Sequence, residues 1–462
     1  MFHFLRRERG FYKRMWLLAL PLILQNLITT SLGFVDTFMV GLLGNNELSA
    51  VTAANAPIFL IQVIVFGLIS GLTVLVSQYW GKGDEDAINR CMGVAMYAGF
   101  LIAGVMALAL FLFPREVMGL VTDNLLLIEI GAPYLRIVGV SYVFNAVSSV
   151  YVGMQRSIEN PAMGMVVFAI SMLLNTLLNY IFIFGKFGAP ALGVTGAAIA
   201  TLTSRIVEFA IVTVYALRCR RLPLRPAALF RPGRAILRSF VKYSTPVILN
   251  ETLWGLGTTV MTSIMGHMAV STEMLAAYAI MGNIDKFSTV TCFGVAGATA
   301  VIVGKRIGEG AKKEEVYSLG CCLLTVSLLV GAVVAACLAA ALPTLFIPHL
   351  YPLFHLEGLA LQIAVTMCTV YIFMMPLKAF DITNITGLLR AGGDARMASV
   401  IDLTPLWCVA VPLTALTGLV LNAPVTLVCL SIQTENLCKM PWGVFRLRSR
   451  KWINAVTRGA EA

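Results

Sequence analysis

Charged residues are scarce in this chain of 462 residues: only 12% are Asp, Glu, Lys or Arg, whereas 58% are hydrophobic. A soluble globular domain carries about 25% charged residues. This shortage excludes a water-soluble fold built around a single core. The composition is typical of a protein that crosses a membrane many times.

The sequence also lacks the motifs of the common enzyme classes. It contains no H-E-x-x-H, no G-x-S-x-G and no nucleotide-binding P-loop pattern. The four histidines are scattered, and the ten cysteines include no C-x-x-C pair, so we interpret the cysteines as small hydrophobic residues. We therefore predict no enzymatic activity and no cofactor. Any uphill transport must be driven by an ion gradient, because nothing here binds a nucleotide.

Long hydrophobic runs dominate the sequence instead. A helix needs about 20 apolar residues to cross a bilayer, and about twelve runs reach this length. They predict an all-α polytopic membrane protein with twelve transmembrane helices. The predicted spans are 15–43, 50–79, 91–113, 127–153, 162–184, 194–217, 240–266, 275–304, 317–347, 359–389, 397–421 and 423–445.

The net charge of +11 would fit a nucleic-acid partner, but the distribution of the basic residues argues against one. They gather at both termini and in every second connection, and only Arg115 and Lys186 lie on the opposite side. Such alternation follows the positive-inside rule. We therefore predict a multi-pass protein of the cytoplasmic (inner) membrane, surrounded by lipid, with both termini cytoplasmic and no nucleic-acid partner.

The two halves of the chain resemble each other. LPLILQN, which contains Pro21, is similar to TPVILNE, which contains Pro246, and the two prolines are 225 residues apart. FGLISGLTVLVSQYWGKG from Phe66 is similar to FGVAGATAVIVGKRIGEG from Phe293, at an offset of 227. We predict two six-helix bundles with the same membrane orientation and a substrate cavity between them. Their predicted ranges are 1–217 and 243–462, joined by a cytoplasmic linker at 218–242 rich in Pro and Arg.

The first span carries an acid and a polar face. Gln25, Thr29, Gly33 and Asp36 recur at steps of three and four, so they share one face of a helix, with Asn26 beside it. A charged acid near the bilayer centre costs about 2.5 kcal/mol or more. We expect Asp36 to face a watery cavity and to hold a coupling ion or proton; the alternative is an acid near the outer end of the helix.

Two further acids are candidates for ion coupling. Glu251 lies near the middle of the seventh span, and Trp254 beside it could stack on a cationic or aromatic substrate. Asp381 lies in the tenth span, three residues after Lys378. Either Asp381 couples an ion, or these two charges neutralise each other.

Other polar residues in the spans allow structural interpretations. Arg205 and Glu208 have the spacing of an ion pair within one helix. Asn175 and Asn179 lie four residues apart on one face, and they could join neighbouring helices or line a polar pocket.

Three stretches resemble the multidrug and toxic compound extrusion (MATE) transporters. VSQYWGKGDEDAINR from Val76 is similar to the end of the family's second helix. NTLLNYIFIFGKFGAPALGVTGAAIAT from Asn175 is similar to its fifth and sixth helices, and NITGLLRAGGDAR from Asn384 to the end of its tenth. The resemblance extends over nearly the full chain.

The resemblance implies a fold of two bundles around a central cavity, and export of organic cations in exchange for H⁺ or Na⁺. It assigns ion coupling to Asp36, with Asn175 and Asn179 beside it. Asn179 takes the place of a second acid that some H⁺-coupled members have. Glu251 matches the sodium-coupled type, in which the tenth-helix acid lies further upstream than Asp381. Glu251 and Asp381 are thus candidate Na⁺ ligands.

These observations predict a secondary active antiporter that exports lipophilic or cationic drugs, acting as a monomer. Gln25, Asn26, Thr29, Asn175, Asn179 and Trp254 are the candidate residues of the substrate cavity. The alternative is a flippase for lipid-linked precursors, which would need cavity arginines to bind an anionic head group. Only Arg136 and Arg205 are candidates for that role.

Overall fold

The computed structural model describes residues 5–231, 233–354 and 356–459. Throughout these ranges the chain is helical, without a β-strand. The first half contains the helices α1 (Arg9–Gly41), α2 (Asn45–Lys82), α3 (Glu85–Leu112), α4 (Pro114–Gly119), α5 (Leu125–Ser157), α6 (Pro161–Phe184), α7 (Gly193–Arg218) and α8 (Pro226–Phe230).

The second half repeats this pattern with more irregular helices. It contains α9 (Arg234–Gly266), α10 (Ser271–Gly308), α11 (Lys313–Ala341), α12 (Tyr351–Leu353), α13 (Gly358–Ile382), α14 (Ala395–Pro405), α15 (Val411–Ala415) and α16 (Val425–Ser449). Four π-helical segments continue these helices: η2 (Leu342–Leu350), η3 (Thr383–Leu389), η4 (Leu406–Ala410) and η5 (Leu416–Val420). Counted with their π-helical continuations, the described residues form twelve long helices, as predicted.

Ten helical segments of the described chain are long and apolar enough to cross a membrane. The two other long helices, α9 and α16, are the most polar. Lys242 and Glu251 lie in α9, and Glu435, Lys439 and Arg446 lie in α16. The ion pairs described below explain how Glu251, Glu435 and Lys439 are retained inside the protein.

The chain forms two compact units, which we call the N-unit and the C-unit. The N-unit comprises Leu24–Ile248 and the residues from Val456 onward, and the C-unit comprises the residues up to Ile23 and Leu249–Ala455. Helices α1 and α9 therefore each contribute residues to both units. The predicted ranges 1–217, 218–242 and 243–462 follow the repeat along the chain, whereas the compact units divide it elsewhere. Their ends at 1–4 and 460–462 lie outside the described residues.

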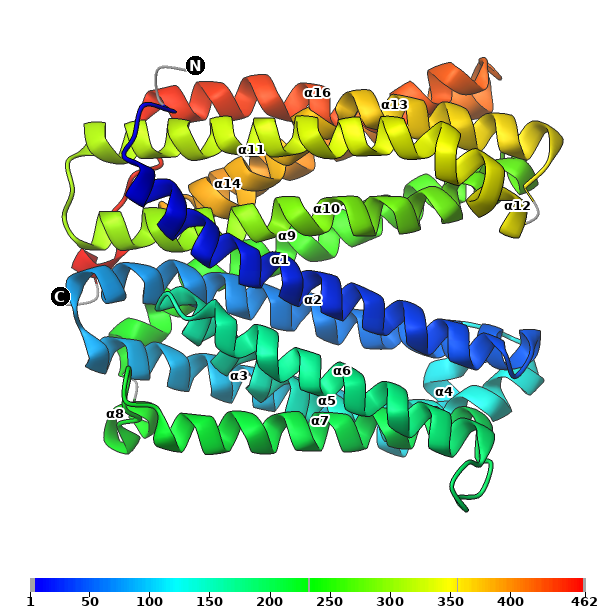
Figure 1. The fold of residues 1–462 in the computed structure, drawn as a ribbon, viewed down its shortest axis with the longest axis horizontal. Coiled ribbons are helices and arrows are strands. Elements are labelled where there is room, and N and C mark those ends of the chain that lie inside the picture. The colour runs from blue at the N-terminus through cyan, green and yellow to red at the C-terminus, as the bar shows by residue number, and fades with distance from the viewer. Residues whose placement is uncertain (1–4, 232, 355, 460–462) are drawn as a thin grey trace. The chain divides into compact units, whose positions relative to one another are not determined.

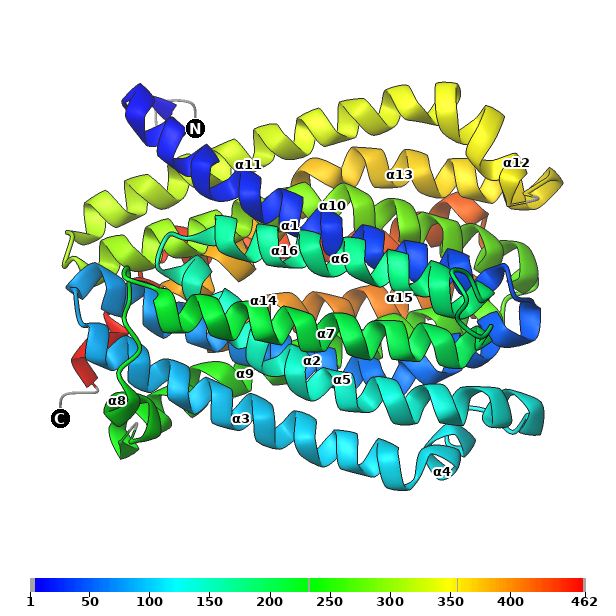
Figure 2. The ribbon, with the colours of Figure 1, turned by 60° about the horizontal axis from the view of Figure 1, so that its bottom comes forward.

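Within the N-unit, α5 is the central helix. It packs against α2, α3 and α7, and α7 packs against α6; these helices lie along one another in Figures 1 and 2. A glycine allows the closest of these approaches. A Cβ atom added at Gly196 of α7 would lie 2.5 Å from the carbonyl oxygen of Phe182 in α6, so only a residue without a side chain fits there.

Within the C-unit, α13 takes the central place and packs against α10, α11 and α16. Gly331 of α11 lies against the backbone of α13, where an added Cβ atom would be 2.9 Å from the Cα atom of Pro376. Small residues at such positions let membrane helices approach closely. The polar residues of α13 are thereby held against their neighbours.

Candidate functional site

In the N-unit, a hydrogen-bonded chain of side chains joins three helices. The Nδ2 atom of Asn179 in α6 donates to Asp36 Oδ1 in α1 at 2.5 Å and to Asn175 Oδ1 at 3.0 Å. Asn175 in turn donates to Thr201 Oγ1 of α7 at 3.4 Å. Both asparagines are almost completely buried. The structure thus brings together the predicted acid and the predicted pair of amides.

Arg205, the cation that acts electrostatically on Asp36, already has its own partner. Arg205 Nη1 lies 2.7 Å from Glu208 Oε2, within α7, and Glu208 is fully buried. This confirms the predicted pair. Among the described residues Asp36 has no ion-pair partner, and the group that contacts it is the neutral amide of Asn179. An acid in this position can exchange a proton without breaking an ion pair.

The remaining polar residues of the first span differ in their hydrogen bonds and in their burial. The hydroxyl of Thr29 donates to the carbonyl oxygens of Gln25 and Asn26 in its own helix, at 3.2 and 2.9 Å. Gln25 lies against Gly164 of α6, and its buried Oε1 has no hydrogen-bond partner within the described chain. Asn26 is half-buried. Gly33, between Thr29 and Asp36, faces open space, so this face of α1 is partly accessible.

In the C-unit, Glu251 is paired with an arginine that the sequence analysis counted among the cytoplasmic residues. Arg390 Nη2 lies 2.8 Å from Glu251 Oε1, and only 2% of the arginine side chain is exposed. Arg390 follows directly after η3, at the end of a predicted span. Arg390 is thus buried at the end of a helix and does not lie in the connection that follows. Position in a hydropathy profile could not reveal a partner 139 residues away.

Asp381 is not paired with Lys378. Lys378 forms an ion pair with Asp285 of α10 instead, so the predicted neutralisation within α13 is wrong. The long lysine side chain reaches across to the neighbouring helix. Asp381 is only 4% exposed, and neither of its carboxylate oxygens has a hydrogen-bond partner among the described residues.

A second buried cluster was missed entirely. Lys439 Nζ in α16 lies 2.9 Å from Asp402 Oδ1 in α14 and 2.8 Å from Glu435 Oε2. Asn250 of α9 donates to the other oxygen of Asp402 at 2.8 Å. We call Asp402, Glu435 and Lys439 the lysine cluster. The i, i+4 spacing of Glu435 and Lys439 was the signal in the sequence, but Lys439 was assigned to the cytoplasmic C-terminus.

The predicted sodium ligands share no metal site in the described part of the chain, where no three His, Cys, Asp or Glu residues form a group suited to a metal. Glu251 contacts a guanidinium, and the carboxylate of Asp381 has no hydrogen-bond partner among the described residues. Trp254 is 39% exposed on α9, and its stacking role stays a prediction.

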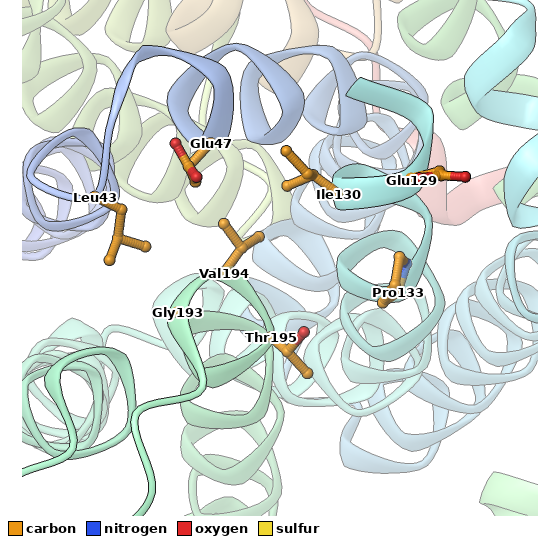
Figure 3. A pocket seen from close by; sticks show the side chains of 8 residues that line it. All are labelled: Leu43, Glu47, Glu129, Ile130, Pro133, Gly193, Val194 and Thr195. Atoms are coloured by element: carbon orange, nitrogen blue, oxygen red, sulfur yellow. The ribbon is translucent and has the colours of Figure 1, made fainter. Parts of the chain in front are cut away.

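A hollow of about 320 Å³ lies beside the connection from α1 to α2 (Figure 3). None of the predicted site residues lines it. Glu129 on α5 points away from Glu47 in this view, so the two carboxylates do not converge on one ligand. The hollow is lined by Leu43, Glu47, Glu129, Ile130, Pro133, Gly193, Val194 and Thr195.

Comparison with known proteins gives consistent results. The model of the MatE family matches residues 21–181 and 246–416, one stretch in each half. An uncharacterised transporter of Bacillus subtilis strain 168, YisQ, is 24% identical over 439 residues, 94% of each chain. The multidrug resistance protein MdtK of Edwardsiella ictaluri is 26% identical over 86% of this chain and 85% of its own.

Solved structures share the fold. An outward-facing multidrug resistance MATE transporter of the MOP superfamily superimposes with a TM-score of 0.85 at 18% identity, over 95% of this chain and 96% of its own. A mutant of the Vibrio cholerae MATE transporter VcmN gives 0.84 at 20% identity, over 96% and 98%. At this level of identity the likeness establishes the fold alone.

Proposed function

The chain belongs to the MatE family, a family of membrane transporters and not of enzymes, and on this premise we propose that it is an antiporter exporting lipophilic, often cationic compounds in exchange for H⁺. Several relatives are named as multidrug resistance proteins, which supports drug export. The observation that carries the choice of ion is the contact between Asp36 and Asn179.

Asp36 and Asn179 form a pair that can respond to a proton. An ionised carboxylate only accepts hydrogen bonds, whereas a protonated one also donates. The Nδ2 atom of Asn179 serves the ionised form. The Oδ1 atom of Asn179 is buried without a partner among the described residues, and it is the natural acceptor for the protonated form. To present Oδ1 to Asp36, the amide must turn and release Asn175.

This rearrangement would connect the proton to the helices. The bonds from Asn179 join α1 to α6, and the bond from Asn175 to Thr201 joins α6 to α7. Protonation would then change the relative energies of two arrangements of the N-unit. Antiport requires that proton and drug favour different conformations, since a ligand shifts an equilibrium only by its differential affinity.

We favour H⁺ over Na⁺ as the coupling ion because Glu251 already has a cationic partner and Asp36 has few ligands around it. Glu251 is held by Arg390 at 2.8 Å, and a carboxylate already neutralised by a buried guanidinium is a poor ligand for a second cation. Among the described residues, the hydrogen-bond partner of the Asp36 carboxylate is the amide of Asn179. A hard cation such as Ca²⁺ takes about six to eight oxygen ligands. One proton is satisfied by one acceptor.

The structure offers no support for the flippase alternative. Arg205 is occupied by Glu208, and Arg136 donates to the carbonyl oxygen of Phe111 at 3.1 Å. Both guanidinium groups thus already have a partner within the protein. From the distribution of basic residues we further propose that the protein lies in the cytoplasmic membrane with both termini in the cytoplasm. That it acts as a monomer stays a prediction.

The test is ethidium efflux from dye-loaded cells that lack their own exporters. Wild type is compared with Asp36→Asn at equal membrane abundance, and Glu129→Gln serves as the matched acid-to-amide control in the same unit. We expect Asp36→Asn to fall to the level of cells without the transporter and Glu129→Gln to remain active. A protonophore should abolish wild-type efflux, and replacing Na⁺ by choline should not. Full activity of Asp36→Asn would refute the assignment of this residue.

A further inference from the structure

The proposed antiport cycle does not use the lysine cluster of the C-unit. Its members are among the least exposed charges of the protein: the side chains of Lys439, Asp402 and Glu435 are 6%, 16% and 19% exposed. Burying an ion costs several kcal/mol unless other charges and hydrogen bonds compensate it. The presence of three ions in one place therefore needs a reason.

The charges of this region do not balance. Two carboxylates share one ammonium in the lysine cluster, and Asp381 is a third buried acid, on α13, which packs against α16. Asp381 is 4% exposed and its oxygens have no hydrogen-bond partner within the described ranges. Asn250 Oδ1, beside Asp402, is likewise buried without a partner there. Asp402 and Glu435 thus share one ammonium, and Asp381 and Asn250 add buried oxygens without partners in the described part of the same unit.

The cation at its centre is part of the chain. Lys439 Nζ lies within 2.9 Å of carboxylate oxygens from two helices, α14 and α16. An ion of about the size of Na⁺, such as Ca²⁺, takes its oxygen ligands at about 2.3–2.6 Å. The ammonium therefore occupies the space between the two carboxylates, and an inorganic cation could not bind there at the same time.

Helix irregularities mark the same place. Asp381 comes two residues before the π-helical segment η3, and Asp402 comes four residues before η4. Asn384 in η3 lies against Gly443 of α16, one turn after Lys439. π-Helical insertions are rare and are frequent at functional sites. Here they continue the two helices that carry Asp381 and Asp402.

We propose that Lys439 is a tethered cation that closes an oxygen-lined site of the C-unit to Na⁺. It makes this half of the transporter independent of sodium, and it is thus a residue that determines ion specificity. The inference rests on the proposed function in one respect, the preference for H⁺ over Na⁺. It predicts that removing the ammonium opens the site to sodium.

The experiment measures sodium binding to the purified full-length protein, without transport. Thermal unfolding is followed in NaCl and in choline chloride at equal ionic strength and fixed pH, for wild type, Lys439→Gln and Lys439→Arg. Because a ligand that binds only the folded state raises its stability with concentration, Lys439→Gln should gain about 2 °C or more in NaCl. Wild type and Lys439→Arg should not respond.

Lys378→Met is the matched control, since it removes another paired lysine of the same unit, bound to Asp285. A sodium response of equal size in Lys378→Met would overturn the proposal, as would a folded Lys439→Gln protein that ignores Na⁺. If Lys439→Gln cannot be isolated, ²²Na⁺ binding to wild type decides: saturable binding lost in Asp402→Asn refutes a closed site, and absence of binding supports it. None of these results depends on dye efflux, so a failure of the sodium-site proposal can be told apart from a failure of the proposed drug export.

Discussion

The pair formed by Glu251 and Arg390 allows a quantitative test of the C-unit. Arg390→Met removes a guanidinium that is 2% exposed and leaves Glu251, which is 22% exposed, without its partner. Glu251→Gln leaves the arginine, whose Nε and Nη1 atoms are already buried without partners in the described chain. The double variant removes both charges.

The expected magnitudes follow from burial. Removing one partner of a fully buried ion pair costs about 3–5 kcal/mol. Because the Glu251 side chain is partly exposed, the Arg390→Met variant should lose about 2–3 kcal/mol of unfolding free energy, at or below the lower end of that range. The double variant should recover most of this loss, because replacing both charges is often close to neutral. The resulting coupling energy is about 1–3 kcal/mol.

The assay is a double-mutant cycle on apparent unfolding free energies of the purified protein, from denaturant titration in detergent. The exposed pair Arg306 and Glu309, at 53% and 32% exposure, is the control, and its cycle should give about 0–1 kcal/mol. Additive effects of Arg390→Met and Glu251→Gln would refute the buried pair. The same variants test function: if Glu251 only neutralises Arg390, the double variant should still export dye.

Two further predictions concern packing and the unpartnered acid. Gly331→Val should destabilise the C-unit by about 1–3 kcal/mol through overpacking, because a Cβ atom there would lie 2.6 Å from the Cβ atom of Ala379. Gly104 faces open space, so Gly104→Val should have little effect. Equal unfolding temperatures for the two variants would contradict this prediction. Asp381→Asn should be tolerated in thermal unfolding, since no hydrogen bond of the carboxylate is lost. Asp402→Asn should lower the unfolding temperature because it weakens bonds to Lys439 and Asn250. A lower unfolding temperature for Asp381→Asn than for Asp402→Asn would show that Asp381 has a structural partner.

Much of the architecture was predictable because its signals are local. Hydrophobic runs of membrane length predict spans wherever they occur, and the repeat at offsets of 225 and 227 residues predicts two similar halves. The predicted polar face of the first span placed Asp36 on the side that contacts α6. Helical periodicity predicted the shared face, since it depends only on neighbours along one helix, whereas the proximity of Asn175 and Asn179 was implied by the family resemblance.

Partners across helices could not be predicted in the same way. Lys378 had an acid three residues away in sequence, yet it binds Asp285, 93 residues away. Arg390 and Lys439 lie near the ends of apolar runs, where hydropathy assigns basic residues to the cytoplasm, yet both are buried in ion pairs. Which side chain meets which depends on the rotation and offset of packed helices.

The sequence by itself therefore determined that the protein is a helical membrane protein built as a repeat, because hydrophobicity, charge and periodicity act over a few turns, and its transport function was implied by the family resemblance. The tertiary structure alone decided which of the buried acids are available. Asp36 has a neutral amide partner, Glu251 has an arginine, Asp402 and Glu435 share a lysine, and Asp381 has no polar partner in the described chain. The physical reason is that ionisation in a membrane depends on contacts between helices, and these contacts join residues that lie far apart in the sequence.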